Sequence, residues 1–164
     1  MTGSYWLYLA CDLDDDTPAE LLDELRWHVG LGPHAPGRLS YPQGSPEYPL
    51  LYPDAEHVTT VGAQAAVLRR LIHHYRPAYE GDEPVHVWSL LLRVEFGDDL
   101  LEPVTDLIPW LAPYCRSAGW VGCLGAGGDP LAAPEQHFYV RDRKAYRGGP
   151  GVEPEPWGAD APPG

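Results

Sequence analysis

The chain has little lysine and no close pair of cysteines. Lys144 is its single lysine beside ten arginines, and with frequent alanine, glycine and proline this predicts a GC-rich genome and a bacterial source. The three cysteines, Cys11, Cys115 and Cys123, are odd in number and form no C-x-x-C motif, so nothing predicts a disulfide framework. We expect free, buried thiols in a reducing compartment.

Long apolar runs and positive charge are also scarce. No segment approaches the length of a membrane span, and residues 1–5 lack the basic and apolar regions of a signal peptide, so we expect a cytoplasmic protein. The formal net charge is −13, from 24 acidic and 11 basic residues. Nucleic acids and anionic membranes attract positive surfaces, so we expect neither as a partner. A basic protein, a polyamine or a metal cation would suit this charge, and the alternative is that it serves solubility alone.

The composition is otherwise that of a single folded domain. The 164 residues are 44% hydrophobic, which allows one domain with a core of its own. Trp (6) and Tyr (10) far outnumber Phe (2). Their large apolar bodies and polar edges suit a small core, pocket walls or interfaces.

The first elements are clear. Residues 4–13 place apolar side chains on both alternating faces, which predicts a central strand covered on both sides. Thr17, Pro18 and Glu20 have the spacing of a helix start, and an apolar stripe continues to Val29. Six prolines then interrupt residues 33–56, which predicts a long loop that packs on the domain as a lid.

The remaining elements alternate. Apolar residues at helical spacing over residues 60–75 predict a second helix, and residues 85–96 form the strongest strand pattern. A third helical region, 100–118, is broken by prolines. Residues 120–124 and 136–143 predict a loose hairpin.

These elements predict an α+β fold in the order β-α-loop-α-β-α-β-β. We expect a single mixed sheet of about four strands with two to three helices packed on it. Residues 1–147 form the expected globular domain, and residues 148–164, rich in Gly, Pro, Glu and Asp, form an expected disordered tail. Trp157 in that tail is either a short docking motif or an unconstrained remnant.

A metal site is considered first among the candidate functional sites. Asp12, Asp14 and Asp16 could supply oxygen ligands to Ca²⁺ or Mg²⁺. An EF-hand loop would need glycine at its sixth position and glutamate at its twelfth, where this chain has Thr17 and Asp23. The favoured interpretation is a solvated turn whose charges stabilise a helix N-terminus, with no metal and no other cofactor.

Histidines and cysteines give weaker candidates. His73 and His74 are adjacent on the expected second helix, with His57 before it, and adjacent helical side chains diverge too far to share one ion. One of them could act as a general base, although an exposed histidine near a helix end is the favoured interpretation. A cysteine paired with a strand histidine could be a nucleophile, but core cysteines are the favoured interpretation. The glycine-rich residues 122–128 are followed by no helix, so they predict a hairpin loop and not a phosphate site.

Two functional hypotheses remain open. The first is a non-catalytic interaction or accessory module, of the immunity, antitoxin or biosynthetic-helper kind, that captures a basic protein. It predicts one acidic face. The second is a small dimeric enzyme that acts on an apolar small molecule, as an isomerase, cyclase or cofactor-free oxygenase. Its candidate base and charged groups are His86, His137, Arg93 and Glu95, and it requires at least two of them to converge in a pocket.

Overall fold

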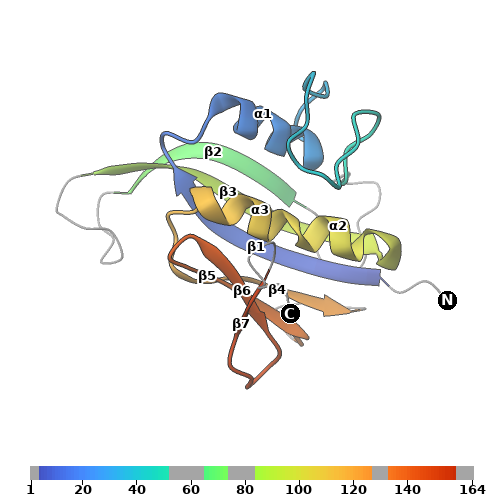
Figure 1. Cartoon of the computed structure of the whole chain (residues 1–164), viewed down its shortest axis with the longest axis vertical. Helices are drawn as coiled ribbons and strands as arrows, with labels where there is room; N and C mark the ends of the chain where they lie inside the picture. Colours follow the sequence, from blue (N-terminus) through green and yellow to red (C-terminus); the bar gives the residue numbers. More distant parts are fainter. Residues whose placement is uncertain (1–3, 52–64, 74–83, 127–132, 158–164) are drawn as a thin grey trace.

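The computed structural model describes residues 4–51, 65–73, 84–126 and 133–157 (Figure 1). The strands are β1 (Ser4–Asp14), β2 (Ala65–His73), β3 (Val85–Gly97), β4 (Gly119–Ala126), β5 (Gln136–Arg141), β6 (Lys144–Gly148) and β7 (Glu155–Pro156). The helical elements are α1 (Ala19–His28) and a segmented stretch of η2 (Asp98–Leu100), α2 (Leu101–Thr105), α3 (Leu107–Leu111) and η3 (Ala112–Tyr114).

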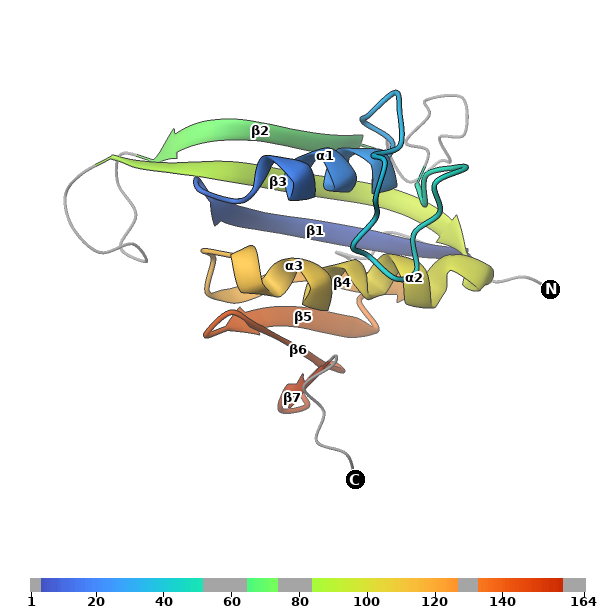
Figure 2. The same ribbon diagram turned by 45° about the horizontal axis from the view of Figure 1, so that its top comes forward.

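All seven strands join one sheet in the order β2-β3-β1-β4-β5-β6-β7. Every neighbouring pair is antiparallel. β1 is central and pairs with β3 on one side and β4 on the other. β1 is thus a central strand, as expected, but the expectation that both of its faces are covered is wrong, because the described helices lie on one side of the sheet only (Figures 1 and 2).

The expected mixed sheet of about four strands, with its order of elements, is therefore wrong. Most of the segment expected as a second helix forms β2, whose nine residues pair with β3. Ala66 and Leu68 pack against the core, whereas Val67 between them is exposed, which is the alternation of a strand. Helical spacing and strand alternation overlap in a short apolar segment, and pairing with β3 decided between them.

The last expected strand, 136–143, forms β5 and pairs antiparallel with β4, but it ends at Arg141, and a tight turn then leads into β6, which was not expected. The two-residue turn, Asp142 and Arg143, has φ values of 51° and 61°. Positive φ at both residues matches the twist of the flanking strands, but glycine or asparagine usually provides it. Arg143 is held in place by Asp14, whose two carboxylate oxygens accept hydrogen bonds of 2.5 and 3.2 Å from its guanidinium. The sequence carried no turn signal of the usual kind at this hairpin.

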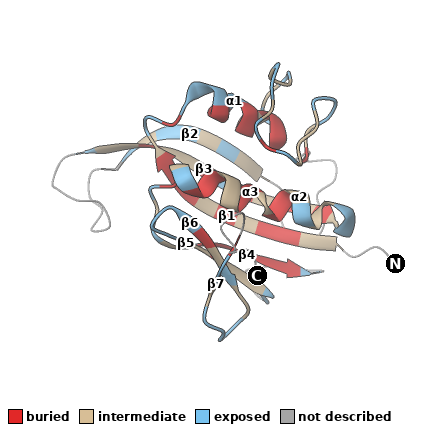
Figure 3. Ribbon diagram, viewed as in Figure 1, coloured by how far each residue is buried: buried red, intermediate tan, exposed pale blue. Residues whose placement is uncertain are grey.

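The helices cover one face of the sheet (Figure 2). α1, residues 33–51 and the α2–α3 stretch lie on this side, and buried side chains line β1 and the inner surfaces of the helices (Figure 3). The core contains Leu7, Leu9 and Leu13 of β1, which alternate with residues on the opposite face. None of the described helices or strands covers that opposite face, which we call the open face. None of the described helices is long and apolar enough to cross a membrane.

Residues 148–157, which the sequence placed in the tail, are described and carry structure. β7 pairs with β6, and the backbone N–H of Trp157 donates to the Ala145 carbonyl at 3.0 Å. The Trp157 side chain is 8% exposed and packs on Phe138 with ring centroids 5.3 Å apart. The apolar surface of the indole thus joins this segment to the core, and residues 158–164 lie outside the described part of the chain.

Candidate functional site

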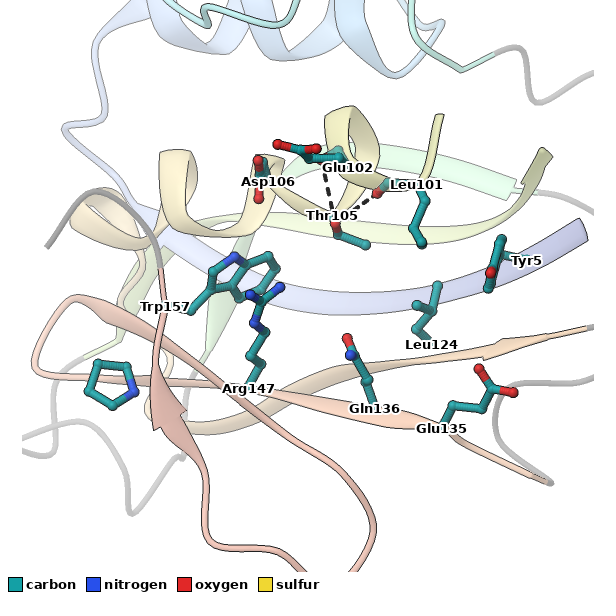
Figure 4. A pocket seen from close by; sticks show the side chains of 11 residues that line it. Tyr5, Leu101, Glu102, Thr105, Asp106, Leu124, Glu135, Gln136, Arg147 and Trp157 are labelled. Atoms are coloured by element: carbon teal, nitrogen blue, oxygen red, sulfur yellow. Dashed lines mark hydrogen bonds between the residues drawn. The ribbon is translucent and has the colours of Figure 1, made fainter. Parts of the chain in front are cut away.

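A cleft of about 840 Å³ lies between α2 and strands β4–β7, on the helix-covered side of the sheet (Figure 4). Its lining contains carboxylates, an arginine and aromatic rings, which come from both ends of the chain. The lining residues are Tyr5, Leu101, Glu102, Thr105, Asp106, Leu124, Glu135, Gln136, Arg147, Pro156 and Trp157.

Three carboxylates line this cleft. Glu102 and Asp106 are four residues apart, so they share one helical face, and Glu135 approaches from the start of β5. One oxygen of Asp106 accepts a 2.6 Å hydrogen bond from the Gln43 side chain. Within the described part of the chain, the carboxylates of Glu102 and Glu135 have no hydrogen-bond or ion-pair partner. Such groups can accept hydrogen bonds from an ammonium or guanidinium group.

The other wall is formed by a cation and an aromatic ring. The Arg147 guanidinium lies 4.9 Å from the Trp157 ring centroid, within the range of a cation–π contact. No carboxylate of a described residue forms an ion pair with Arg147. Thr105 donates its hydroxyl hydrogen to the Leu101 carbonyl at 2.7 Å, inside its own helix. The cleft thus offers three acidic groups, one cation and an apolar floor, which suits binding and supplies no nucleophile–base pair.

The carboxylates of the cleft also act on Tyr41, which lies beside the cleft. Burial, together with the charges of Asp106 and Glu102, raises the pKa of the Tyr41 phenol. The phenol therefore keeps its proton and donates it to the Pro103 carbonyl at 2.5 Å. This bond ties the proline-rich segment to α2 beside the cleft.

A buried glutamate and histidine hold that same segment against α1. Glu24 is 3% exposed and accepts hydrogen bonds from four donors: His28 Nε2 at 2.8 Å, Ser40 N at 2.6 Å, Ser40 Oγ at 2.9 Å and Tyr41 N at 2.8 Å. Burial acts to raise the pKa of Glu24, but the donors outweigh it and the pKa is lowered. Because His28 is 0% exposed and all four hydrogen bonds of Glu24 go to residues of this chain, we assign the pair a structural role.

Sequence reasoning missed this pair. The signal was present as a glutamate and a histidine at i, i+4 spacing on a correctly expected helix. A second cavity of about 580 Å³ lies beside Glu24 and is lined partly by Glu20, Arg38 and Ser40.

The proposed catalytic residues do not converge. Arg93, Glu95 and His137 lie on the open face, whereas His86 lies on the other face of β3, seven residues and roughly 23 Å along the strand from Arg93. Arg93 and His137 share one cross-strand row, three strand spacings or about 14 Å apart. None of these four residues lines either of the two cavities above.

Each of these residues has its own local setting. The Arg93 guanidinium lies 5.9 Å from the Trp6 ring, and Glu95 accepts a hydrogen bond from the Ser4 hydroxyl. His137 Nδ1 accepts a 2.9 Å hydrogen bond from the Trp120 indole N–H. His86 Nδ1 is buried without a hydrogen-bond partner among the described residues. The contacts named here are with neighbouring residues of the sheet.

All three cysteines are buried, and no disulfide joins any two of them. Cys123 stands directly opposite His137 on the neighbouring strand, but it is 1% exposed, which keeps reagents from its sulfur. Cys11 and Cys115 contact each other under α3. The Cys11 thiol donates a hydrogen bond to the Cys115 sulfur, which together with burial raises the pKa of Cys11, and the same bond lowers the pKa of Cys115. These settings are those of core thiols.

The three candidate metal ligands have different surroundings. Both oxygens of Asp14 bind Arg143, Asp12 lies at the end of β1 with 9% exposure, and Asp16 is exposed. In the described ranges, no group of three His, Cys, Asp or Glu side chains is placed to hold a metal ion. His57 and His74 lie outside these ranges, and His73 belongs to β2 and not to a helix.

Comparisons with known proteins add no further constraint. No family model matches this chain, and neither the curated proteins nor the solved structures contain a match. A proposal about function therefore depends on the chemistry of the surfaces described above.

Proposed function

We propose that this chain is a non-catalytic binding module that captures a basic segment of a partner protein in the cleft between α2 and β4–β7. The observation that carries the proposal is the set of three cleft carboxylates, two of which have no partner among the described residues. A lysine or arginine side chain entering the cleft would supply the missing hydrogen-bond donors.

The distribution of charge supports a basic partner. We define the helix layer as residues 15–51 and 98–114, which pack on one side of the sheet. It carries two basic residues, Arg26 and Arg38, against ten acidic ones. The acidic residues are Asp15, Asp16, Glu20, Asp23, Glu24, Glu47, Asp98, Asp99, Glu102 and Asp106. Such a concentration of one sign favours and steers the approach of an oppositely charged surface.

Two features of the cleft favour an interaction with an extended segment. Its floor and sides include Tyr5, Leu124 and Trp157, which can cover the apolar stem of a lysine or arginine. Figure 4 places Glu102 on the helix side of the cleft, and Glu135 and Arg147 on the strand side. The segment that fits would therefore present separate cations to Glu102 and to Glu135, and an apolar or acidic group to Arg147.

Binding of short labelled peptides, measured by fluorescence anisotropy, tests the proposal. A lysine- and arginine-rich peptide should bind, whereas a glutamate-rich peptide of equal length should not. Each exposed ion pair contributes about 0.2–1 kcal/mol. The double variant Glu102→Gln/Glu135→Gln should therefore bind the basic peptide about 2- to 30-fold more weakly, and the binding should also weaken as salt is added.

A matched double variant controls for total charge. Glu20→Gln/Glu47→Gln removes the same charge from exposed positions of the helix layer outside this cleft. It should weaken binding less than twofold. Equal losses for the two double variants would show that the charge acts as a whole and that the cleft is not the site.

The proposed module works in the cytoplasm. Its three cysteines are buried and form no disulfide with one another, and a compartment that keeps thiols reduced suits such residues.

A further inference from the structure

Four aromatic side chains form a continuous row across the open face. Tyr8 of β1 stacks on Trp120 of β4, with ring centroids 5.9 Å apart and ring planes 20° apart. Trp120 stands opposite Tyr139 of β5, which stands opposite Tyr146 of β6. We call these four residues the aromatic ladder; it spans three strand spacings, about 14 Å. Trp120 is 44% exposed, so a large apolar surface of the ladder faces solvent.

The ladder also fixes the tautomer of a histidine. The Trp120 indole N–H donates to His137 Nδ1 at 2.9 Å, so this nitrogen must be unprotonated. The proton of the neutral imidazole then lies on Nε2, for which no described residue provides a hydrogen-bond acceptor. Because His137 is only partly buried, Nε2–H is a donor held in a fixed orientation beside the exposed indole.

Positive charges lie at the two ends of the ladder although the whole chain is acidic. The Arg141 guanidinium lies 5.5 Å from the ring centroids of both Tyr139 and Tyr146, and Lys144 stands opposite Arg141. Arg141 also forms a 3.9 Å ion pair with Glu153, whose side chain is 89% exposed. At the other end, Arg93 stands opposite Tyr8. The net charge of −13 is thus unevenly distributed, because the helix layer on the other side of the sheet holds much of the acid.

We propose that the aromatic ladder binds a planar ring bearing a carboxylate or a phosphate. The ring stacks on Trp120, and the anionic group accepts the hydrogen bond of His137 Nε2–H within the field of the neighbouring cations. Charge complementarity selects an anion over a neutral or cationic ring. This site lies on the opposite side of the sheet from the cleft, so it is independent of the proposed function.

Isothermal titration calorimetry with three small probes tests this site. The probes are 1-naphthoate, adenosine 5′-monophosphate, and 1-naphthylmethylammonium, which has the same ring system as naphthoate but the opposite charge. At least one anionic probe should bind, and the cationic probe should bind at least tenfold more weakly. Naphthoate binding alone would identify the ligand as an aromatic carboxylate, and nucleotide binding alone would identify it as a planar base with a phosphate attached through a sugar; both results support the proposal.

Variants separate stacking from hydrogen bonding. Trp120→Ala should weaken the binding of the anionic probe roughly 5- to 100-fold, because one stacking surface is lost. Trp120→Phe keeps a ring but removes the indole N–H, so it should weaken binding less and release the fixed tautomer of His137, which nitrogen-15 NMR of the imidazole detects. Leu91→Ala, on the same face and 36% exposed but outside the ladder, should change binding less than twofold.

Several results would overturn the proposal. These are no binding of either anion at about 5 mM, equal binding of the cationic probe, or unchanged binding in Trp120→Ala. A His137 that carries its proton on Nδ1 in the unsubstituted protein would contradict the hydrogen-bond assignment on which the orientation depends.

Discussion

Replacing Glu24 by glutamine should destabilise the protein because this one carboxylate serves four hydrogen-bond donors. Its Oε1 accepts from the backbone and hydroxyl of Ser40, and its Oε2 accepts from His28 Nε2 and the Tyr41 backbone. A glutamine keeps one acceptor oxygen and replaces the other with an NH₂ group, which donates. At least one buried donor among these residues then loses its acceptor.

The size of the effect follows from that count. An unsatisfied buried donor costs about 1–3 kcal/mol, and hydrogen bonds to a charged acceptor are stronger than neutral ones. His28 can relieve one conflict by changing tautomer, but its Nδ1 has no partner among the described residues to accept the moved proton. We therefore expect Glu24→Gln to lower the free energy of unfolding by about 2–4 kcal/mol, which for a chain of this length lowers Tm by about 4–16 °C.

Urea unfolding and hydrogen exchange provide the assay. Exchange should accelerate first in the backbone of residues 33–51, because this segment is tied to α1 through Glu24. Glu20→Gln, one turn earlier on the exposed side of α1, is the control and should change stability by less than about 0.5 kcal/mol. A Tm for Glu24→Gln within about 1 °C of the unsubstituted protein would refute the reasoning.

The same residue predicts a pH dependence. The pKa of Glu24 is lower in the folded state than in the unfolded chain, where it is about 4.3. The folded state therefore binds its proton less readily, and the stabilisation is present above the unfolded pKa. It should be lost as the pH falls from about 4.3 through the folded pKa, and this part of the acid sensitivity should be absent from Glu24→Gln.

Three further substitutions test the sheet. A Cβ at Gly122 would lie 2.2 Å from the Tyr8 carbonyl oxygen, so Gly122→Ala should lower the free energy of unfolding by about 2–4 kcal/mol in urea. The control is Gly37→Ala, which should be nearly neutral because no atom lies within 4 Å of its new Cβ. Arg143→Gly should be more stable than Arg143→Ala by about 1 kcal/mol in the same assay, because φ is 61° there and both variants lose the ion pair equally; equal stabilities would contradict a left-handed turn. Trp157→Ala should lower the free energy of unfolding by about 3–5 kcal/mol, because its ring is 8% exposed; a loss below about 1 kcal/mol would show that the last strand contributes little to the core.

Several elements could be predicted from the sequence because their signals are local. Residues 4–13 were expected as a central strand and form β1 (Ser4–Asp14), and residues 85–96 were expected as a strand and form β3 (Val85–Gly97). Helix α1 was also expected, although Thr17 was expected to cap it. Thr17 instead donates its hydroxyl to the Asp14 carbonyl at 2.6 Å, which closes the turn before the helix.

Other elements depended on contacts between distant residues. β2 was expected as a helix because its apolar spacing suits both structures, and pairing with β3 selected the strand. The turn between β5 and β6 was missed because Arg143 is unusual at positive φ, although Asp142 before it is of a type that often adopts it. Arg143 can occupy this position partly because Asp14, 129 residues earlier, binds its guanidinium.

The candidate sites divide in the same way. The sequence by itself determined the acidity, the number of cysteines and the abundance of Trp and Tyr, since these are properties of composition. Only the tertiary structure decided that Glu102 and Asp106 share a cleft with Glu135 and Arg147, and that Trp120 meets Tyr8 and His137 on the open face. The physical reason is that antiparallel pairing places side chains from distant segments about 5 Å apart, and a sequence does not reveal its own strand register.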